Sequence, residues 1–189
     1  MFIQTEDTPN PSTLKFIPGC VVMKSGTAAF ADRNDCKNSP LAEQLFSSEH
    51  VSGVFFASDF ITITKKDDIE WDLLKPELLS IIMDHFVSGG EVVIESKDSS
   101  ESNKVQEGDS EVIKQIKELL EDRVRPAVAM DGGDIIFHKY EEGIVYLEMH
   151  GACSGCPSSG ITLKNGIESM LKHFIPEIES VQDINESSA

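Results

Sequence analysis

The pattern of apolar and polar positions in the first half of the chain predicts a mixed fold of strands and helices. Short apolar runs bounded by turn residues are expected to be strands at residues 2–5, 13–17, 54–57, 60–64 and 92–94. Apolar residues recur at helical spacing between Trp71 and Val87. A second helix is expected at Ser39-Pro40, because Ser before Pro is typical of a helix start. Pro76 leaves two possible starts for the longer helix, since proline suits a first turn.

The pattern in the second half predicts an α+β layer. A helix capped by Ser110 has apolar residues at helical spacing, and Pro126 is expected to disturb its end. Two strands follow at residues 135–140 and 144–149, joined by a short loop in which Gly143 suits a left-handed backbone. The remaining elements are a second helix, which Ile175-Pro176 ends, and a short strand within residues 178–184. Their order predicts one sheet covered by helices.

A polar segment separates the two halves. Residues 95–109 contain a single apolar residue, Val105, among serine and charged residues. Such a segment cannot bury enough apolar surface to offset the entropy of ordering, so we expect a flexible acidic, Ser-rich linker. The predicted organisation is a domain at 1–94, a linker at 95–109 and a domain at 110–189.

Composition and charge narrow the function classes. Hydrophobic residues make up 40% of the 189 residues, which is ordinary for a globular protein, and 33 acidic against 16 basic residues give a formal charge of −17. An acidic surface repels phosphate, so nucleic acid is not expected as a partner. The sequence has no apolar run of about 18 residues, so no membrane span is expected. The start is neither a signal peptide nor a transit sequence, which favours a bacterial cytoplasm, with a processed mitochondrial matrix protein as the alternative.

The strongest chemical signal is Cys153-Ser154-Gly155-Cys156, followed by Pro157 and a helical pattern. Backbone N–H groups and the dipole at a helix start favour the thiolate, which is the form that binds metal. The flanking residues are small, so we expect both sulfur atoms to be open to a large ligand. Two thiolates do not complete a four-ligand zinc or iron–sulfur site. A second copy of the chain, related by a two-fold axis, is the simplest source of the other two.

Other interpretations of the cysteine pair remain open at this point. The pair could be a redox dithiol, a zinc-linked structural module or two unreactive thiols in a loop. Cys20 and Cys36 could complete a site within one chain, but their spacing matches no metal pattern, and small packed or surface thiols are expected. His150 is a weaker candidate ligand. The turn interpretation is favoured over metal binding for Asp131-Gly132-Gly133-Asp134. No arrangement typical of a catalytic triad is present.

Stretches in both halves of the chain match a known protein family. They are residues 123–128, 131–134, 151–159, 163–164 and 166–168 in the second half, and residues 4–11, 15–16, 18–19 and 53–56 in the first. Through them the chain resembles the Nfu family of iron–sulfur scaffold and carrier proteins: the second half resembles its NifU-like C-terminal domain, and the first half its N-terminal domain. Gly160 stands where the resemblance predicts threonine, which should loosen the first helical turn without removing ligation.

The resemblance implies a fold class and a function. The fold is α+β: two small mixed α/β domains joined by a linker, the C-terminal one a NifU-like helix–hairpin–CxxC loop–helix unit. Cys153 and Cys156 are implied to ligate a 4Fe–4S cluster, with 2Fe–2S as the alternative, shared by two subunits of a homodimer. The cluster would come from an upstream assembly scaffold and pass to apo iron–sulfur proteins. No enzyme activity is implied, and protein purified in air would lack the cluster. Partner recognition is the expected role of the N-terminal domain.

Overall fold

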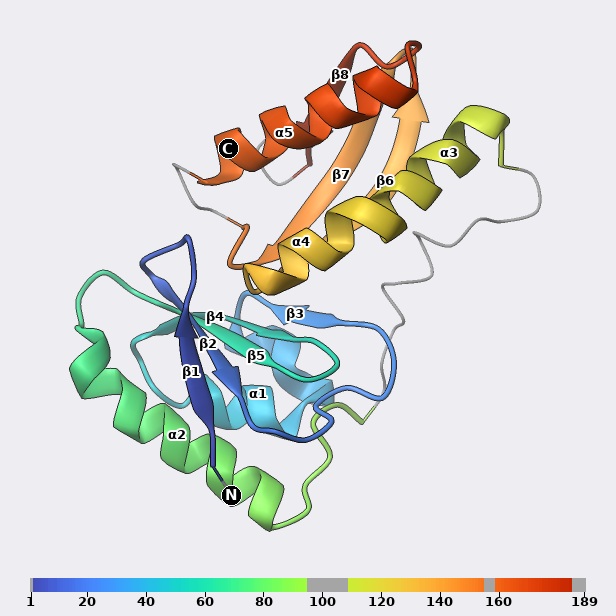
Figure 1. Cartoon of the computed structure of the whole chain (residues 1–189). Helices are drawn as coiled ribbons and strands as arrows, with labels where there is room; N and C mark the ends of the chain where they lie inside the picture. The colour runs from blue at the N-terminus through green and yellow to red at the C-terminus, as the bar shows by residue number, and fades with distance from the viewer. Residues whose placement is uncertain (1, 95–108, 155–158, 185–189) are drawn as a thin grey trace. The chain divides into compact units, whose positions relative to one another are not determined.

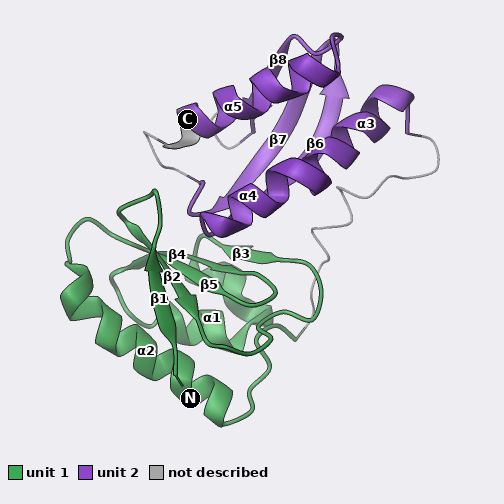
Figure 2. Cartoon of the chain, in the orientation of Figure 1, with its two compact units in different colours: residues 1–98 green, residues 99–189 purple. Residues whose placement is uncertain are grey.

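The structure, a computed structural model, describes residues 2–94, 109–154 and 159–184. The chain divides into two compact units, residues 1–98 and 99–189 (Figures 1 and 2). Each unit is a sheet with helices packed against it, as the α+β pattern predicts. The predicted linker falls outside the described residues except for Asp109, so its boundaries and its flexibility stay predictions.

Unit 1 contains a five-stranded antiparallel sheet in the order β1-β2-β5-β4-β3. Its strands are β1 (Gln4–Asp7), β2 (Thr13–Ile17), β3 (Ala28–Phe30), β4 (Val51–Phe56) and β5 (Ile61–Lys65). The predicted hairpin is confirmed as β4 and β5, which pair in register from Gly53 to Phe56. The first strand lies two residues later than the sequence predicts.

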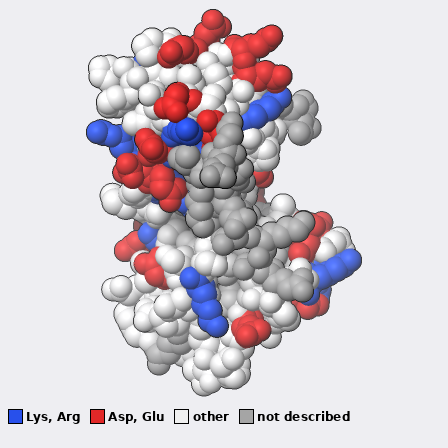
Figure 3. All heavy atoms as spheres, turned by 90° about the vertical axis from the view of Figure 1, so that its right-hand side faces the viewer, with Lys and Arg blue, Asp and Glu red and all other residues white. Residues whose placement is uncertain are grey.

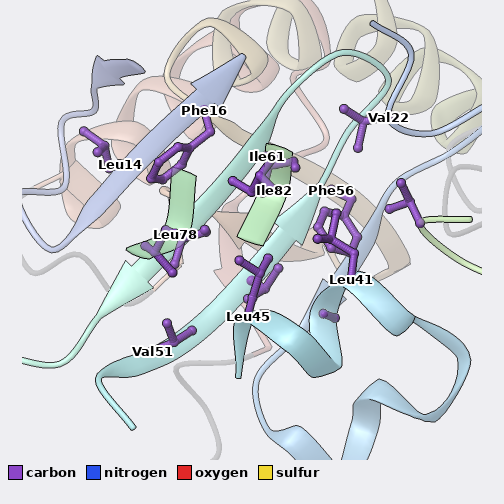
Figure 4. Packing of buried hydrophobic residues seen from close by; sticks show 14 of the residues in the cluster. Leu14, Phe16, Val22, Leu41, Leu45, Val51, Phe56, Ile61, Leu78 and Ile82 are labelled. Carbon is purple, nitrogen blue, oxygen red and sulfur yellow. The ribbon is translucent and has the colours of Figure 1, made fainter. Parts of the chain in front are cut away.

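The helices of unit 1 supply the other half of its core. They are the 3₁₀ helix η1 (Arg33–Asn38), α1 (Pro40–Leu45) and α2 (Trp71–Val87). The expected cap of α1 is confirmed, since the Ser39 hydroxyl accepts a hydrogen bond from the Ala42 amide at 3.2 Å. Figure 4 shows side chains from both α-helices and from the sheet meeting in one apolar cluster that includes Leu41, Leu45, Leu78, Ile82, Phe16, Phe56 and Ile61.

Two sequence predictions for unit 1 are wrong or incomplete. Residues 92–94 form no strand. Instead, the Ser39 hydroxyl donates to the Val92 carbonyl at 2.5 Å, and the Ile94 amide donates to the Asn38 carbonyl at 2.8 Å. These hydrogen bonds satisfy the Val92 carbonyl and the Ile94 amide, and Val92 is buried, so the segment needs no neighbouring strand. Strand β3 was not predicted, because three residues are too short for a periodic signal.

Unit 2 contains a three-stranded sheet with helices on one face (Figure 1). Its elements are α3 (Glu111–Leu119), a π-helical turn η3 (Leu120–Val124), α4 (Arg125–Met130), β6 (Gly133–Glu141), β7 (Ile144–Gly151), α5 (Ser159–Phe174) and β8 (Ser180–Asp183). Strands β6 and β7 are antiparallel and β8 is parallel to β7. The predicted hairpin loop is confirmed, with Gly143 at φ 80°.

The expected disturbance of the first helix near Pro126 is confirmed. The chain stays helical from Glu111 to Met130, but a π turn at Leu120–Val124 interrupts the α-helix shortly before the proline. The Arg125 amide donates to the Leu120 carbonyl, five residues back. Proline has no N–H to donate, and its ring would clash with a carbonyl four residues earlier. The wider turn accommodates both effects, so the helix changes its hydrogen-bond register instead of stopping.

Candidate cysteine-loop site

Cys153 lies in the turn that follows β7 and precedes α5. Its side chain belongs to the unit 2 core and the residue is 6% exposed, so the expectation of an open sulfur is wrong for this cysteine. The Ser154 amide donates to the Gly151 carbonyl at 3.1 Å, which closes the turn. Cys156 lies outside the described residues. The position of its thiol relative to that of Cys153 therefore stays a prediction.

Gly133 gives Cys153 the space for this position. The first residue of β6, Gly133, is paired with Gly151 at the end of β7. A Cβ atom at position 133 would lie 2.7 Å from the Cys153 Sγ and 2.7 Å from the His150 carbonyl oxygen. Real side chains do not tolerate such contacts, and the backbone atom cannot move aside as a flexible side-chain end could. The close approach of the two loops therefore requires glycine here.

An ion-pair network holds the start of β6, next to Gly133. The Arg125 guanidinium donates to both carboxylate oxygens of Asp134, at 2.8 and 2.9 Å, and to Glu121 at 2.8 Å. The Asp134 side chain is 6% exposed and that of Arg125 is 18% exposed. Burial alone would lower the pKa of Arg125, but the hydrogen bonds to Asp134 and Glu121 outweigh it and raise the pKa above its ordinary value.

The network reaches the cysteine loop through the backbone. Asp134 directly follows Gly133, and the neighbouring Gly132 carbonyl accepts a hydrogen bond from the Ala152 amide at 3.1 Å. The turn before β6 is thus joined to the residue before Cys153. The sequence predicts a turn at residues 131–134; the structure confirms it for Asp131 and Gly132, whereas Gly133 and Asp134 begin β6. The pairing of Asp134 with Arg125 was missed, because a bidentate ion pair between a helix and a strand leaves no periodic signal.

Glu148 bridges two histidines on the face of the sheet opposite the core. The Nε2 atoms of His138 and His150 lie 2.8 Å from separate carboxylate oxygens of Glu148. Burial alone would raise the pKa of Glu148, but its hydrogen bonds to His150 and His138 lower it further than burial raises it. His150, weighed above as a ligand, therefore has its Nε2 engaged with a carboxylate in this structure.

The cysteines of unit 1 have separate environments. Cys20 is exposed, whereas Cys36 is 1% exposed and belongs to the unit 1 core. Burial raises the pKa of the Cys36 thiol to about 11, and the neighbouring carboxylates of Asp35, Glu43 and Asp32 add to the rise. A thiol that resists deprotonation is a poor metal ligand. Within residues 2–94, 109–154 and 159–184, no three His, Cys, Asp or Glu side chains are arranged to hold a metal ion.

Acidic side chains dominate the surface charge. On the face drawn in Figure 3, carboxylates gather in patches on unit 2 and also occur on unit 1, with fewer basic side chains among them. Among the described residues, no helix is long and apolar enough to cross a membrane.

Unit 2 thus has the features of a class of small α+β domains that present a CxxC loop between a strand and a helix. Comparison with known proteins gives the family. A family model described as scaffold protein Nfu/NifU N terminal matches residues 3–89, and the NifU-like domain model matches residues 116–182. Together these matches span most of the chain, one for each unit. The chain belongs to the Nfu family of scaffold proteins.

Curated relatives agree with these matches. Proteins from Drosophila sechellia and Drosophila erecta are 51% and 50% identical to this chain over 185 residues, and both are named NFU1 iron-sulfur cluster scaffold homolog, mitochondrial. Each alignment covers 97% of this chain and 65% of the relative, so the chain spans about two thirds of their length. A solution structure of a NifU-like protein from Saccharomyces cerevisiae is 27% identical, with a TM-score of 0.46, over 51% of this chain and 87% of that chain.

Proposed function

We propose that this chain carries an iron–sulfur cluster as cargo, bound through the thiolates of Cys153 and Cys156, and passes it to apo-proteins. The observation that carries the proposal is the packing of the Cys153 turn against Gly133 in a member of a scaffold family. A cluster of the 4Fe–4S type fits four thiolates, and one chain supplies two from this loop. The cluster is therefore shared between two copies of the chain.

A cluster that is shared between two chains is suited to delivery to another protein. A cluster held by two thiolates from each of two chains loses half of its ligands when the chains separate. Dimer formation is then linked to cluster binding, and cluster release is linked to dissociation. Four thiolates within one chain would retain the cluster more firmly. The burial and raised pKa of Cys36 support the view that unit 1 contributes no ligand.

The redox alternative has less support. A thioredoxin-type oxidoreductase needs a larger sheet around its cysteine pair, and the described part of unit 2 has a three-stranded sheet in the order β6-β7-β8. The scaffold family also favours cargo binding over catalysis. The relatives named above are described as mitochondrial, so they favour a mitochondrial location over the bacterial cytoplasm that the sequence alone favours.

Anaerobic reconstitution of the full chain tests the proposal. We expect about two iron and two sulfide per chain, an absorbing cluster, and a mass by light scattering of about twice 20.8 kDa. Cys153→Ser and Cys156→Ser should each reduce iron and sulfide to background. The control combines Cys20→Ser with Cys36→Ala and should keep the full content.

The outcomes separate the competing functions. A holo form that stays monomeric with all its iron contradicts sharing. Iron and sulfide uptake that survives both serine changes at 153 and 156 contradicts the ligand assignment. A colourless protein that catalyses disulfide reduction would identify a redox dithiol, and a colourless protein with stoichiometric zinc would identify a structural zinc module.

A further inference from the structure

The outer face of α2 in unit 1 presents an apolar stripe to solvent. Leu73 and Val87 are 72% and 73% exposed, and Met83 is 39% exposed. With the exposed Pro76, these side chains fall on one side of the helix at spacings of three, seven and four residues. The opposite side of α2 is already occupied, because Leu74, Leu78 and Ile82 are fully buried against the sheet. We call Leu73, Pro76, Met83 and Val87 the α2 stripe.

Such a helix is unusual for a surface element. A helix that covers one face of a sheet normally has an apolar inner face and a polar outer face. Single exposed apolar residues need no explanation, but four on one side of a helix over about four turns form an apolar stripe, which the exposed Ser80 interrupts between Pro76 and Met83. Their spacing is close to that of the a and d positions that pack one helix against another.

A cavity lies near the C-terminal end of α2. Phe86, one turn beyond Met83, lines this cavity of about 470 Å³ together with Val93 and the loop residues Val21 and Met23. Lys24 and Glu91 also line it, so its lining is mixed. The apolar part of such a cavity can accept a large side chain from a helix that lies along the stripe.

The charges beside the stripe indicate the kind of partner. Glu77 and Asp84 are exposed and lie along one border of the stripe, and Asp72 lies along the other. The whole chain has a formal charge of −17. A second acidic copy of this chain would be repelled at such a border, and so would an anionic lipid surface. A cationic helix would be attracted.

We propose that the α2 stripe and its cavity dock a basic amphipathic helix of a partner protein. The apolar face of that helix covers Leu73, Met83 and Val87, its basic residues face Glu77 and Asp84, and one bulky apolar residue enters the cavity. Unit 1 then selects the partner, while unit 2 holds the cargo. The proposal concerns recognition alone and does not depend on the cluster.

Binding of a model peptide to the cluster-free full chain tests this. The probe is a synthetic helix of about 18 residues with leucine at the a and d positions and lysine elsewhere. Titration of the ¹⁵N-labelled chain should shift the amide signals of residues 73–93. An otherwise identical peptide with glutamate in place of lysine should bind about tenfold more weakly or not at all.

Two variants separate the apolar and electrostatic contributions. The triple change Leu73→Gln, Met83→Gln and Val87→Thr should weaken binding about tenfold or more, because it removes the apolar contacts and leaves the charge unchanged. The change Glu77→Gln with Asp84→Asn should weaken binding less and should reduce its dependence on salt. The matched control is Met130→Gln, which removes an apolar side chain that is 76% exposed in unit 2 and should leave binding unchanged.

Several results would overturn the proposal. These are no binding of the leucine–lysine peptide, equal binding of the glutamate peptide, or signal shifts outside unit 1. Self-association of the chain without peptide, abolished by the triple change, would show that a second copy covers the stripe. Preferential binding to anionic vesicles would show a membrane surface instead. Since the assay contains no iron, none of these results changes the test of Cys153 and Cys156.

Discussion

Among the residues that the structure describes, each unit buries one cysteine, and the two sites differ in what surrounds the thiol. Cys36 belongs to η1 and to the core of unit 1, donates to the Asp32 carbonyl at 3.4 Å, and has three acidic residues nearby. Cys153 in unit 2 lies in a turn against a glycine. The carboxylate that directly follows this glycine, Asp134, is paired with Arg125.

The difference shows that burial alone does not decide what a cysteine can do. Nearby carboxylates and burial oppose thiolate formation, so Cys36 behaves as a small apolar side chain. Near Cys153, the Asp134 carboxylate is paired with the Arg125 guanidinium, and the turn before β6 is joined to the cysteine loop by a backbone hydrogen bond. The surroundings of Cys153 therefore impose position without adding an unpaired negative charge from Asp134.

The largest expected effect comes from breaking the Arg125–Asp134 pair. Asp134→Ala leaves a mostly buried guanidinium with Glu121 alone, and we expect a loss of about 3 kcal/mol in the free energy of unfolding. Chemical denaturation of the cluster-free chain measures it. Asp131→Ala, in the same turn but exposed, is the control and should stay within about 0.5 kcal/mol of the unchanged chain. Equal effects of the two changes would show that the pair does not hold the turn.

The next effect tests the close approach at Gly133. Gly133→Ala places a Cβ atom 2.7 Å from both Cys153 Sγ and a backbone oxygen, so the loop must move. We expect a loss of about 2 kcal/mol in stability and reduced cluster uptake. Gly166→Ala, in α5 with no atom within 4 Å of the added Cβ, should stabilise the chain by about 0.5 kcal/mol. Normal cluster uptake by Gly133→Ala would show that the position of Cys153 is not critical.

The fold could be predicted from sequence where the signal is local. The cap at Ser39, the extent of α2 and the Gly143 loop follow from short-range chemistry, and the structure confirms them. The prediction of a strand at residues 92–94 was wrong, because an apolar run does not show whether its backbone groups will form hydrogen bonds with a strand or with a loop. The sequence predicts the disturbance at Pro126 but not its form, a π turn after which the helix continues to Met130.

The candidate site could be predicted only in part. The cysteine pair is visible as a motif, and the resemblance supplies its chemistry. The space that Gly133 leaves and the charge that Arg125 supplies depend on how α4, β6 and β7 pack in three dimensions, although these elements follow one another in the sequence. Spacing alone therefore finds the candidate ligands but not the residues around them.

A smaller effect concerns the pH dependence of Cys36. Because burial raises its pKa from 9.0 to about 11, the unfolded chain loses this proton at lower pH than the folded chain. Stability should then fall by about 2 kcal/mol between pH 9 and pH 11 on this account. Cys36→Ala should remove that part of the slope, measured by denaturation at both pH values. Cys20→Ser, at an exposed thiol, should keep it, and an unchanged slope in Cys36→Ala would contradict the assignment.

The smallest expected effect is that of Glu148, on the face of the sheet opposite the core. Its pKa is lowered by hydrogen bonds to His150 and His138 despite burial, so its stabilising contribution is present above its usual pKa of 4.5. That contribution is lost as the pH falls through the lower folded pKa. Glu148→Gln should cost about 0.5 kcal/mol at pH 6 and flatten the acid limb of the stability curve. Glu118→Gln, at an exposed position on α3, should leave that limb unchanged. If Glu148→Gln also left the limb unchanged, the bridge would contribute nothing to the fold, and the ion-pair network that matters beside the loop would be that of Arg125 alone.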